Sequence, residues 1–150
     1  MEFSVKEINM ELNRLYKRQN EFYDRYANAC GLSSPALLTL YAIYEAEEPL
    51  TQNKIAQIWC LPKQTVNFTV SSLVKKGCLR LEQIGGARNS KAVLLTDDGY
   101  ALCDKCIKPL MTAEENSLLQ LMPDERMQFL ALSNKLCDYL EKEIIALISK

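Results

Sequence analysis

A group of polar residues near the middle of the chain has the types and spacing of a recognition surface. It alternates with Val66, Val70, Leu73 and Val74, whose helical spacing predicts the inner face of a helix over residues 62–76. The outer face then presents amide, hydroxyl and ammonium groups, which can hydrogen-bond to base edges and phosphates of nucleic acid. The candidate binding residues of this helix are Lys63, Gln64, Thr65, Asn67, Phe68, Ser71 and Lys75.

Three of these side chains have specific partners in duplex DNA. The carboxamide of Gln64 or Asn67 can pair with adenine, and the ammonium of Lys63 can contact guanine or a phosphate. If the first half of the helix enters the major groove, two copies related by a twofold axis should contact an inverted repeat with half-sites about 34 Å apart.

Charge is distributed unevenly along the chain. Residues 51–96 hold seven Lys and Arg residues against Glu82 alone, a net charge of +6, which leaves −7 for the rest of the chain. A basic centre between acidic ends is expected when one segment meets phosphates. The alternative is a solvated surface whose charges separate by chance, so the elements that hold these residues must decide between the two.

Two short helices joined by a tight turn are predicted to position the polar group. Thr51 suits the N-cap of the first helix and is itself a candidate DNA contact. Residues 60–62 form the turn, and Gly77 ends the second helix. This pattern is typical of a helix-turn-helix. The expected inner face of the first helix consists of Ile55, Ala56, Ile58 and Trp59.

A β-hairpin is predicted directly after the helix-turn-helix. Two extended runs, residues 78–84 and 92–96, flank a segment that contains two glycines. The tip carries Arg88 and Lys91 without an acidic residue, so it can reach DNA beside the second helix. A solvated loop is the alternative for this tip.

Longer helices are predicted on both sides of this lobe, over residues 4–29, 35–46, 97–120 and 123–149. The 35–46 helix is apolar almost all around its axis, so we expect it to be buried or to lie between subunits. The first and last helices carry more apolar side chains than one small lobe can cover, which predicts a homodimer.

The composition limits the classes of function. A length of 150 residues with 48% hydrophobic and 25% charged residues is typical of one globular domain. The chain has no His, the commonest general base and metal ligand, so we expect no enzyme activity, metal or cofactor. No apolar stretch approaches the roughly 20 residues of a membrane span, and the first residues lack the pattern of a signal peptide. These features predict a cytoplasmic protein.

The six cysteines are expected to be reduced and buried, because most lie in apolar helical patterns. Cys103 and Cys106 form a CxxC pair on one face of a helix, which allows a redox couple, half of a metal site, or simple packing. We favour packing, because no His and no second CxxC completes a set of four ligands. Cys30 and Cys137 are interpreted as packing residues as well.

The chain resembles the MarR family of transcriptional regulators. The resemblance lies in LTQNKIAQIWCLPKQTVNFTVSSLVKKGCL, the hairpin end AVLLTDDG, and PLMTAEENSLLQLMPDERMQFLALSNKL. It implies a mainly α fold with a small β-hairpin wing, in which residues 33–99 form a winged helix-turn-helix lobe. Within a single domain over residues 1–150, it assigns residues 4–29 and 100–149 to a helical dimerisation region. It further implies a homodimeric repressor that binds an inverted-repeat operator and responds to a small-molecule effector.

Three positions depart from the family pattern. The wing usually carries an Asp followed two residues later by Arg, and residues 87–89 here read Ala-Arg-Asn. Cys60 occupies a turn position that is usually Gly, and Phe68 stands where the recognition helix often has Arg. The sequence preference should therefore differ from that of other members. Two alternatives stay open, namely a winged-helix protein-interaction module and a redox-responsive regulator that uses Cys103 and Cys106.

Overall fold

The structure is a computed structural model that describes residues 2–85 and 90–150. It is mainly helical with one two-stranded antiparallel hairpin in the described residues, so the predicted fold class is confirmed. The chain divides into two compact units, one up to Lys108 and one from Pro109 onward. The elements are α1 (Val5–Ala29), α2 (Ser34–Glu45), α3 (Gln52–Trp59), α4 (Lys63–Lys75), β1 (Leu79–Gln83), β2 (Lys91–Leu95), α5 (Asp97–Leu119) and α6 (Pro123–Ile148).

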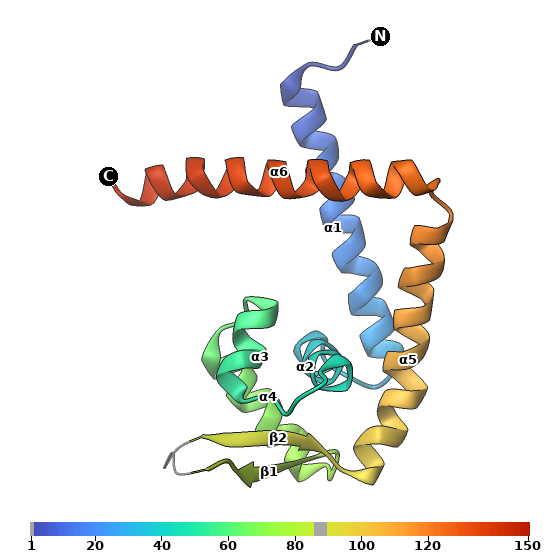
Figure 1. Ribbon diagram of the computed structural model, residues 1–150, viewed down its shortest axis with the longest axis vertical. Helices are drawn as coiled ribbons and strands as arrows, with labels where there is room; N and C mark the ends of the chain where they lie inside the picture. The colour runs from blue at the N-terminus through green and yellow to red at the C-terminus, as the bar shows by residue number, and fades with distance from the viewer. Residues whose placement is uncertain (1, 86–89) are drawn as a thin grey trace. The chain divides into compact units, whose positions relative to one another are not determined.

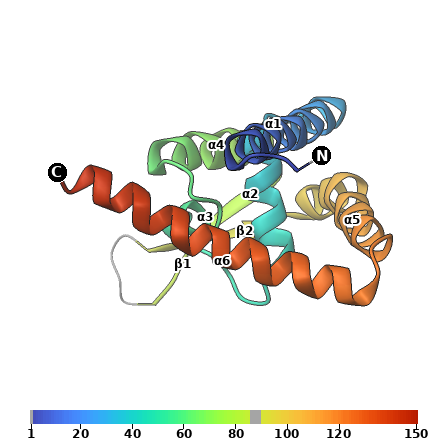
Figure 2. The ribbon, with the colours of Figure 1, turned by 90° about the horizontal axis from the view of Figure 1, so that it is seen from above.

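Helix α2 is the centre of the first unit. It contacts α1, α3, α4 and β2, which are grouped around it in both ribbon views (Figure 1, Figure 2). Its N-cap is Ser33, whose hydroxyl accepts a hydrogen bond from the Ala36 N–H at 3.2 Å. Leu37 and Leu40 are fully buried, so the apolar circumference of α2 becomes the core against which the recognition elements pack.

The helix-turn-helix forms as predicted, with one error on its first helix. Thr51 caps α3 by accepting a hydrogen bond from the Lys54 N–H at 3.2 Å. Ile55 and Ala56 are buried, whereas Ile58 is 44% exposed, so its assignment to the inner face was wrong. Ile58 follows Ile55 by three residues, which turns it to the side of the helix away from Ala56.

The turn between α3 and α4 places Cys60 in the left-handed region, with φ 50° and ψ 41°. This conformation closes α3, because the Leu61 N–H can then donate to the Ala56 carbonyl at 2.9 Å. A side chain at such a position costs about 1–2 kcal/mol relative to the right-handed region. Cys60, which stands where the family usually has Gly, therefore keeps the turn but strains its backbone.

The hairpin is attached to the lobe by its second strand. The register pairs Leu79 with Leu95 and Leu81 with Val93. The Val93 N–H also donates to the Leu50 carbonyl at 2.8 Å, so the segment before α3 lies along the other edge of β2. Val93 is fully buried and Leu95 nearly so, which fixes the base of the hairpin beside the start of α3.

A close backbone approach joins the hairpin to α5. Thr96 accepts a hydrogen bond from the Gly99 N–H at 3.1 Å, and its own N–H donates to the Cys78 carbonyl at 3.1 Å. The Thr96 hydroxyl also donates to the Gly77 carbonyl at 2.5 Å. A Cβ at position 99 would overlap the Cys78 carbonyl oxygen, so only glycine fits here without a shift.

Two of the six cysteines are buried, and both lie in α5. Cys103 and Cys106 are 0% and 2% exposed, as the packing alternative predicts. Burial raises the pKa of the Cys103 thiol to about 12 and that of Cys106 to about 11. The Tyr26 hydroxyl donates to the Cys106 carbonyl at 2.5 Å and joins α1 to α5. Cys60 and Cys137 are exposed and Cys30 and Cys78 are half-buried in this single chain, so the expectation that the six cysteines are buried is wrong for these four. Within one chain Cys137 therefore does not act as a packing residue.

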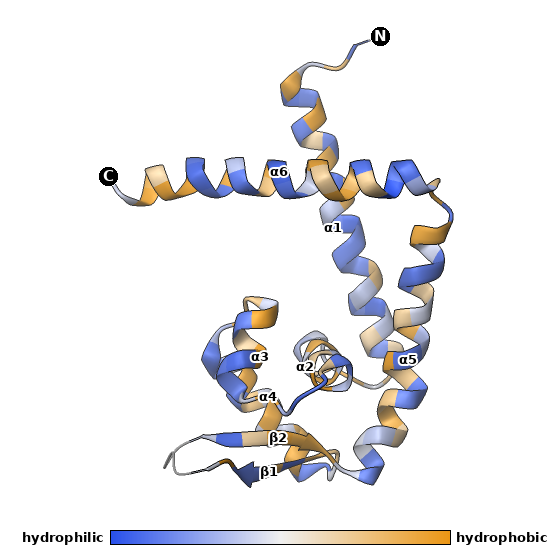
Figure 3. Cartoon of the chain, viewed as in Figure 1, coloured by the Kyte–Doolittle hydropathy of each residue, from blue (hydrophilic) through white to orange (hydrophobic). Residues whose placement is uncertain are grey.

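Helix α6 and the first part of α1 bury little apolar surface within one chain. Among the described residues, α6 buries none of its own and α1 buries only Ala27. Leu132 and Leu140 of α6 are 65% and 55% exposed, and apolar residues recur along both helices (Figure 3). None of the described helices has the length and apolar character needed to cross a membrane.

Candidate nucleic-acid interface

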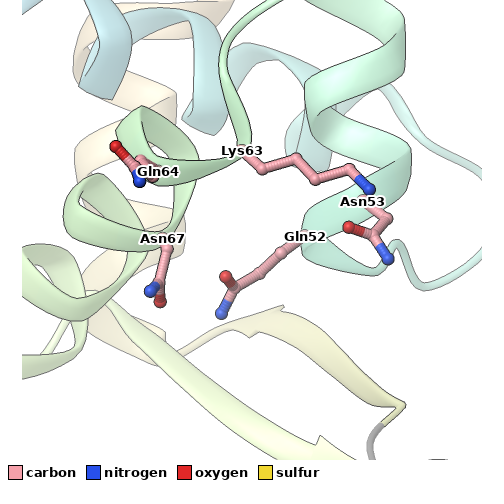
Figure 4. Close-up of a pocket in the computed structure, with 5 residues that line it drawn as sticks. All are labelled: Gln52, Asn53, Lys63, Gln64 and Asn67. Atoms are coloured by element: carbon pink, nitrogen blue, oxygen red, sulfur yellow. The ribbon is translucent and has the colours of Figure 1, made fainter.

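A polar hollow of about 320 Å³ lies between the beginnings of α3 and α4. It is lined by Gln52 and Asn53 from α3 and by Lys63, Gln64 and Asn67 from α4 (Figure 4). The Lys63 side chain extends from α4 toward Asn53, and the carboxamides of Gln52 and Asn67 point into the open space (Figure 4). The hollow thus holds four carboxamides and one ammonium, all of which can exchange hydrogen bonds with nucleic acid.

A second hollow of about 240 Å³ continues this surface toward the hairpin. It is lined by Thr51, Gln52, Asn53, Ser90 and Lys91, so Gln52 and Asn53 belong to both hollows. We call the eight residues of the two hollows the polar surface. It joins the starts of α3 and α4 to the first residue of β2.

The outward side of α4 extends from the polar surface along the helix. Gln64, Phe68, Ser71 and Lys75 follow one another at steps of three or four residues and are all exposed, so they share one face. The opposite face is buried, with Val66 and Val70 at 0% and Leu73 at 2% exposure, as predicted. Thr69 is also buried, and Thr65 and Val74 are half-buried at the edges.

The electrostatic character of this region is positive. Glu82 is the only acidic residue between positions 51 and 96, and it forms an ion pair with Arg80 at 2.9 Å. No described side chain caps the N-terminus of α4, where Pro62 is the N-cap. The positive end of the α4 dipole therefore lies at the start of the helix, where Lys63 and Gln64 of the polar surface are located. Both features favour an anionic partner.

The structure brings together only part of the predicted set. Thr51, Lys63, Gln64, Asn67 and Lys91 line the polar surface. The predicted residues Thr65, Phe68, Ser71 and Lys75 lie on α4 outside it, and Arg88 lies outside the described residues.

Gln52, Asn53 and Ser90 also line the polar surface, although they were not among the predicted binding residues. The signal for the first two was their position directly after the N-cap Thr51. The first turn of α3 faces the same way as the first turns of α4, so polar side chains there join the surface.

Comparison with known proteins finds a MarR family match over part of the chain and a shared fold over most of it. A model of the MarR family matches residues 31–88, from the end of α1 into the hairpin. No protein with a curated description matches the sequence. Among solved structures, the MepR–DNA complex of Staphylococcus aureus is 21% identical, covers 93% of this chain and 99% of its own, and has a TM-score of 0.74.

Two further structures give the same result. A MarR family regulator from Neisseria meningitidis is 23% identical over 89% of this chain and 96% of its own, with a TM-score of 0.73. PcaV from Streptomyces coelicolor, solved with its natural ligand, is 21% identical over 91% and 98%, with a TM-score of 0.67. The helices and hairpin described above therefore have the arrangement of known winged helix-turn-helix proteins.

Proposed function

We propose that this chain, whose residues 31–88 match a model of the MarR family, is a member of that family and a sequence-specific DNA-binding transcriptional regulator. The observation that carries the proposal is the polar surface on α3, α4 and β2, which lies in a basic segment whose one acid is already paired. The regulator acts as a repressor on DNA in the cytoplasm and has no enzymatic role. The similar MepR structure was solved as a DNA complex, which supports the choice of partner.

Helix α4 is proposed to lie in the major groove, with its first turns against the bases. Gln64 and Asn67 then contact base edges, with Thr65 and Ser71 beside them. Lys63 and Lys91 contact phosphates at the two ends of the polar surface. Thr51 at the start of α3 and Lys75 at the end of α4 each add a further DNA contact. Arg88, which lies outside the described residues, is proposed as a DNA contact from its charge.

A homodimer is proposed because α1 and α6 expose apolar side chains that a second copy can cover. Two lobes related by a twofold axis then contact two half-sites of an inverted repeat. A small-molecule effector is part of the proposal, since the similar PcaV structure holds its natural ligand.

The test is a titration of full-length protein on short genomic duplexes at several salt concentrations. Lys63→Ala and Lys91→Ala should each weaken binding to all duplexes. Each should also make the log–log salt slope shallower by about 0.9 for every phosphate that the variant no longer neutralises. Gln64→Ala should cost about 1–3 kcal/mol on the preferred duplex only.

Lys105→Ala is the matched control, because Lys105 is exposed on α5 away from the polar surface. It should leave the salt slope unchanged. Absence of duplex binding by the wild type would contradict the proposal and favour a winged-helix protein-interaction module.

A further inference from the structure

Phe68 is the one large apolar side chain on the outward side of α4. It is 78% exposed, whereas Val66 and Val70 on either side of it in sequence are fully buried. It follows Gln64 by four residues, so these two side chains lie one turn apart on the same face, and its neighbour Asn67 is exposed as well. An exposed phenyl ring amid amides and hydroxyls contributes nothing to the core of the chain.

The polar groups around Phe68 favour one class of base. Asn and Gln side chains pair bidentately with the N6 and N7 atoms of adenine, whereas Arg is the commonest reader of guanine. Helix α4 contains Gln64 and Asn67 but no Arg, and Gln52 of α3 adds a third carboxamide to the same hollow. Lys63 is directed toward Asn53 of α3 (Figure 4), which suits a phosphate contact better than a base contact.

We infer that the outward side of α4 selects A·T base pairs, with Phe68 contacting the C5-methyl group of thymine and Asn67 or Gln64 pairing with adenine. This inference rests on the proposed function and specifies which base pairs the outward side of α4 binds. Thymine is the only base with a methyl group in the major groove, and apolar side chains are its usual partners. Docking on a methyl group also removes the exposed phenyl ring from water.

The experiment begins with selection of a preferred duplex from a random library by the full-length protein. Each thymine of the half-site is then replaced by deoxyuridine, which removes only the methyl group, and each adenine by 7-deazaadenine, which removes only N7. At one thymine, loss of the methyl should weaken wild-type binding about fourfold, the value of one buried methylene-sized group. At one adenine, loss of N7 should weaken binding about five- to 150-fold.

The variants assign each effect to a residue. Phe68→Ala should bind thymine and deoxyuridine duplexes equally, and it should fold normally because the ring is exposed. Lys105→Ala, which changes an exposed residue of α5 outside the proposed DNA contacts, is the control and should keep the fourfold preference for thymine. Asn67→Ala or Gln64→Ala should abolish the 7-deazaadenine effect and retain the thymine effect.

The outcomes separate this inference from the function on which it rests. The inference is overturned if the wild type selects a duplex with G·C pairs in contact with α4. It is also overturned if loss of the thymine methyl leaves wild-type affinity unchanged. Neither result contradicts DNA binding itself. A thymine preference that persists in Phe68→Ala also overturns the inference. A wild type that selects no duplex overturns both.

Discussion

Replacing Gly99 by Ala tests the junction that holds the hairpin on α5. A Cβ at this position would overlap the Cys78 carbonyl oxygen and lie 3.0 Å from its carbon and 3.1 Å from Leu95 Cδ2. Favourable carbon contacts are about 3.5–4.0 Å, so the backbone of Cys78 or of α5 must move. Helix propensity alone predicts the opposite sign, a gain of about 1 kcal/mol for Ala over Gly.

The expected cost combines overpacking with weakened hydrogen bonds. Overpacking in a tight site costs about 1–3 kcal/mol. The Thr96 N–H to Cys78 carbonyl bond and the Gly99 N–H to Thr96 hydroxyl bond, both 3.1 Å, would lengthen with the shift. A net hydrogen bond contributes about 0.5–1.5 kcal/mol, so we expect a loss of about 3 kcal/mol. At about 2–4 °C per kcal/mol for a chain of this size, Tm should fall by about 6–12 °C.

The assay is thermal unfolding followed by circular dichroism at one fixed protein concentration, since dimerisation makes Tm depend on concentration. Gly77→Ala is the matched control, because its φ of +78° is strained for Ala while no atom lies within 4 Å of the added Cβ. That control should cost about 1–2 kcal/mol. If Gly99→Ala melted at or above the Tm of Gly77→Ala, the close approach to Cys78 would be refuted.

The strained turn, the cysteines and the exposed apolar helices give four further predictions. Cys60→Gly should raise stability by about 0.5–1 kcal/mol in chemical unfolding, because it relieves the left-handed conformation at φ 50°; a decrease would contradict the strain. Timed thiol labelling at neutral pH should modify exposed Cys60 and Cys137 before Cys103 and Cys106, and peroxide should leave DNA affinity unchanged. Stability should fall as pH rises from about 9 toward 12, because unfolded Cys ionises near 9.0 while burial raises the folded pKa of Cys103 to about 12; stability that stayed constant over that range would contradict the burial. Light scattering should give twice the 17.1 kDa of one chain, and a mass of one chain at micromolar concentration would refute the dimer.

The helices could be predicted because the residues that begin and end them can be recognised in the local sequence. Thr51 and Pro123 begin helices where the sequence placed them, and Gly77 follows the end of α4 as predicted. Such caps satisfy backbone groups within a few residues, so no tertiary contact is needed to recognise them.

The site was only partly predictable because it forms between elements. Gln52 and Asn53 contribute because α3 packs beside α4. The spacing of apolar residues in the sequence does not reveal how two helices pack. Ile58 was misplaced because an eight-residue helix gives too few turns to define a face. In the sequence, Phe68 was only a departure from the family pattern. Its exposure became known from the structure.

The central claim is that the polar surface of a twofold dimer reads duplex DNA. The most direct measurement is enrichment and sequencing of fragmented genomic DNA bound by full-length protein, with a Gln64→Ala, Asn67→Ala double variant in parallel. Wild-type fragments should share an inverted repeat whose half-sites lie about 34 Å apart, and the double variant should lose that motif. Fragments without a common motif, or a motif unchanged in the double variant, would contradict the account.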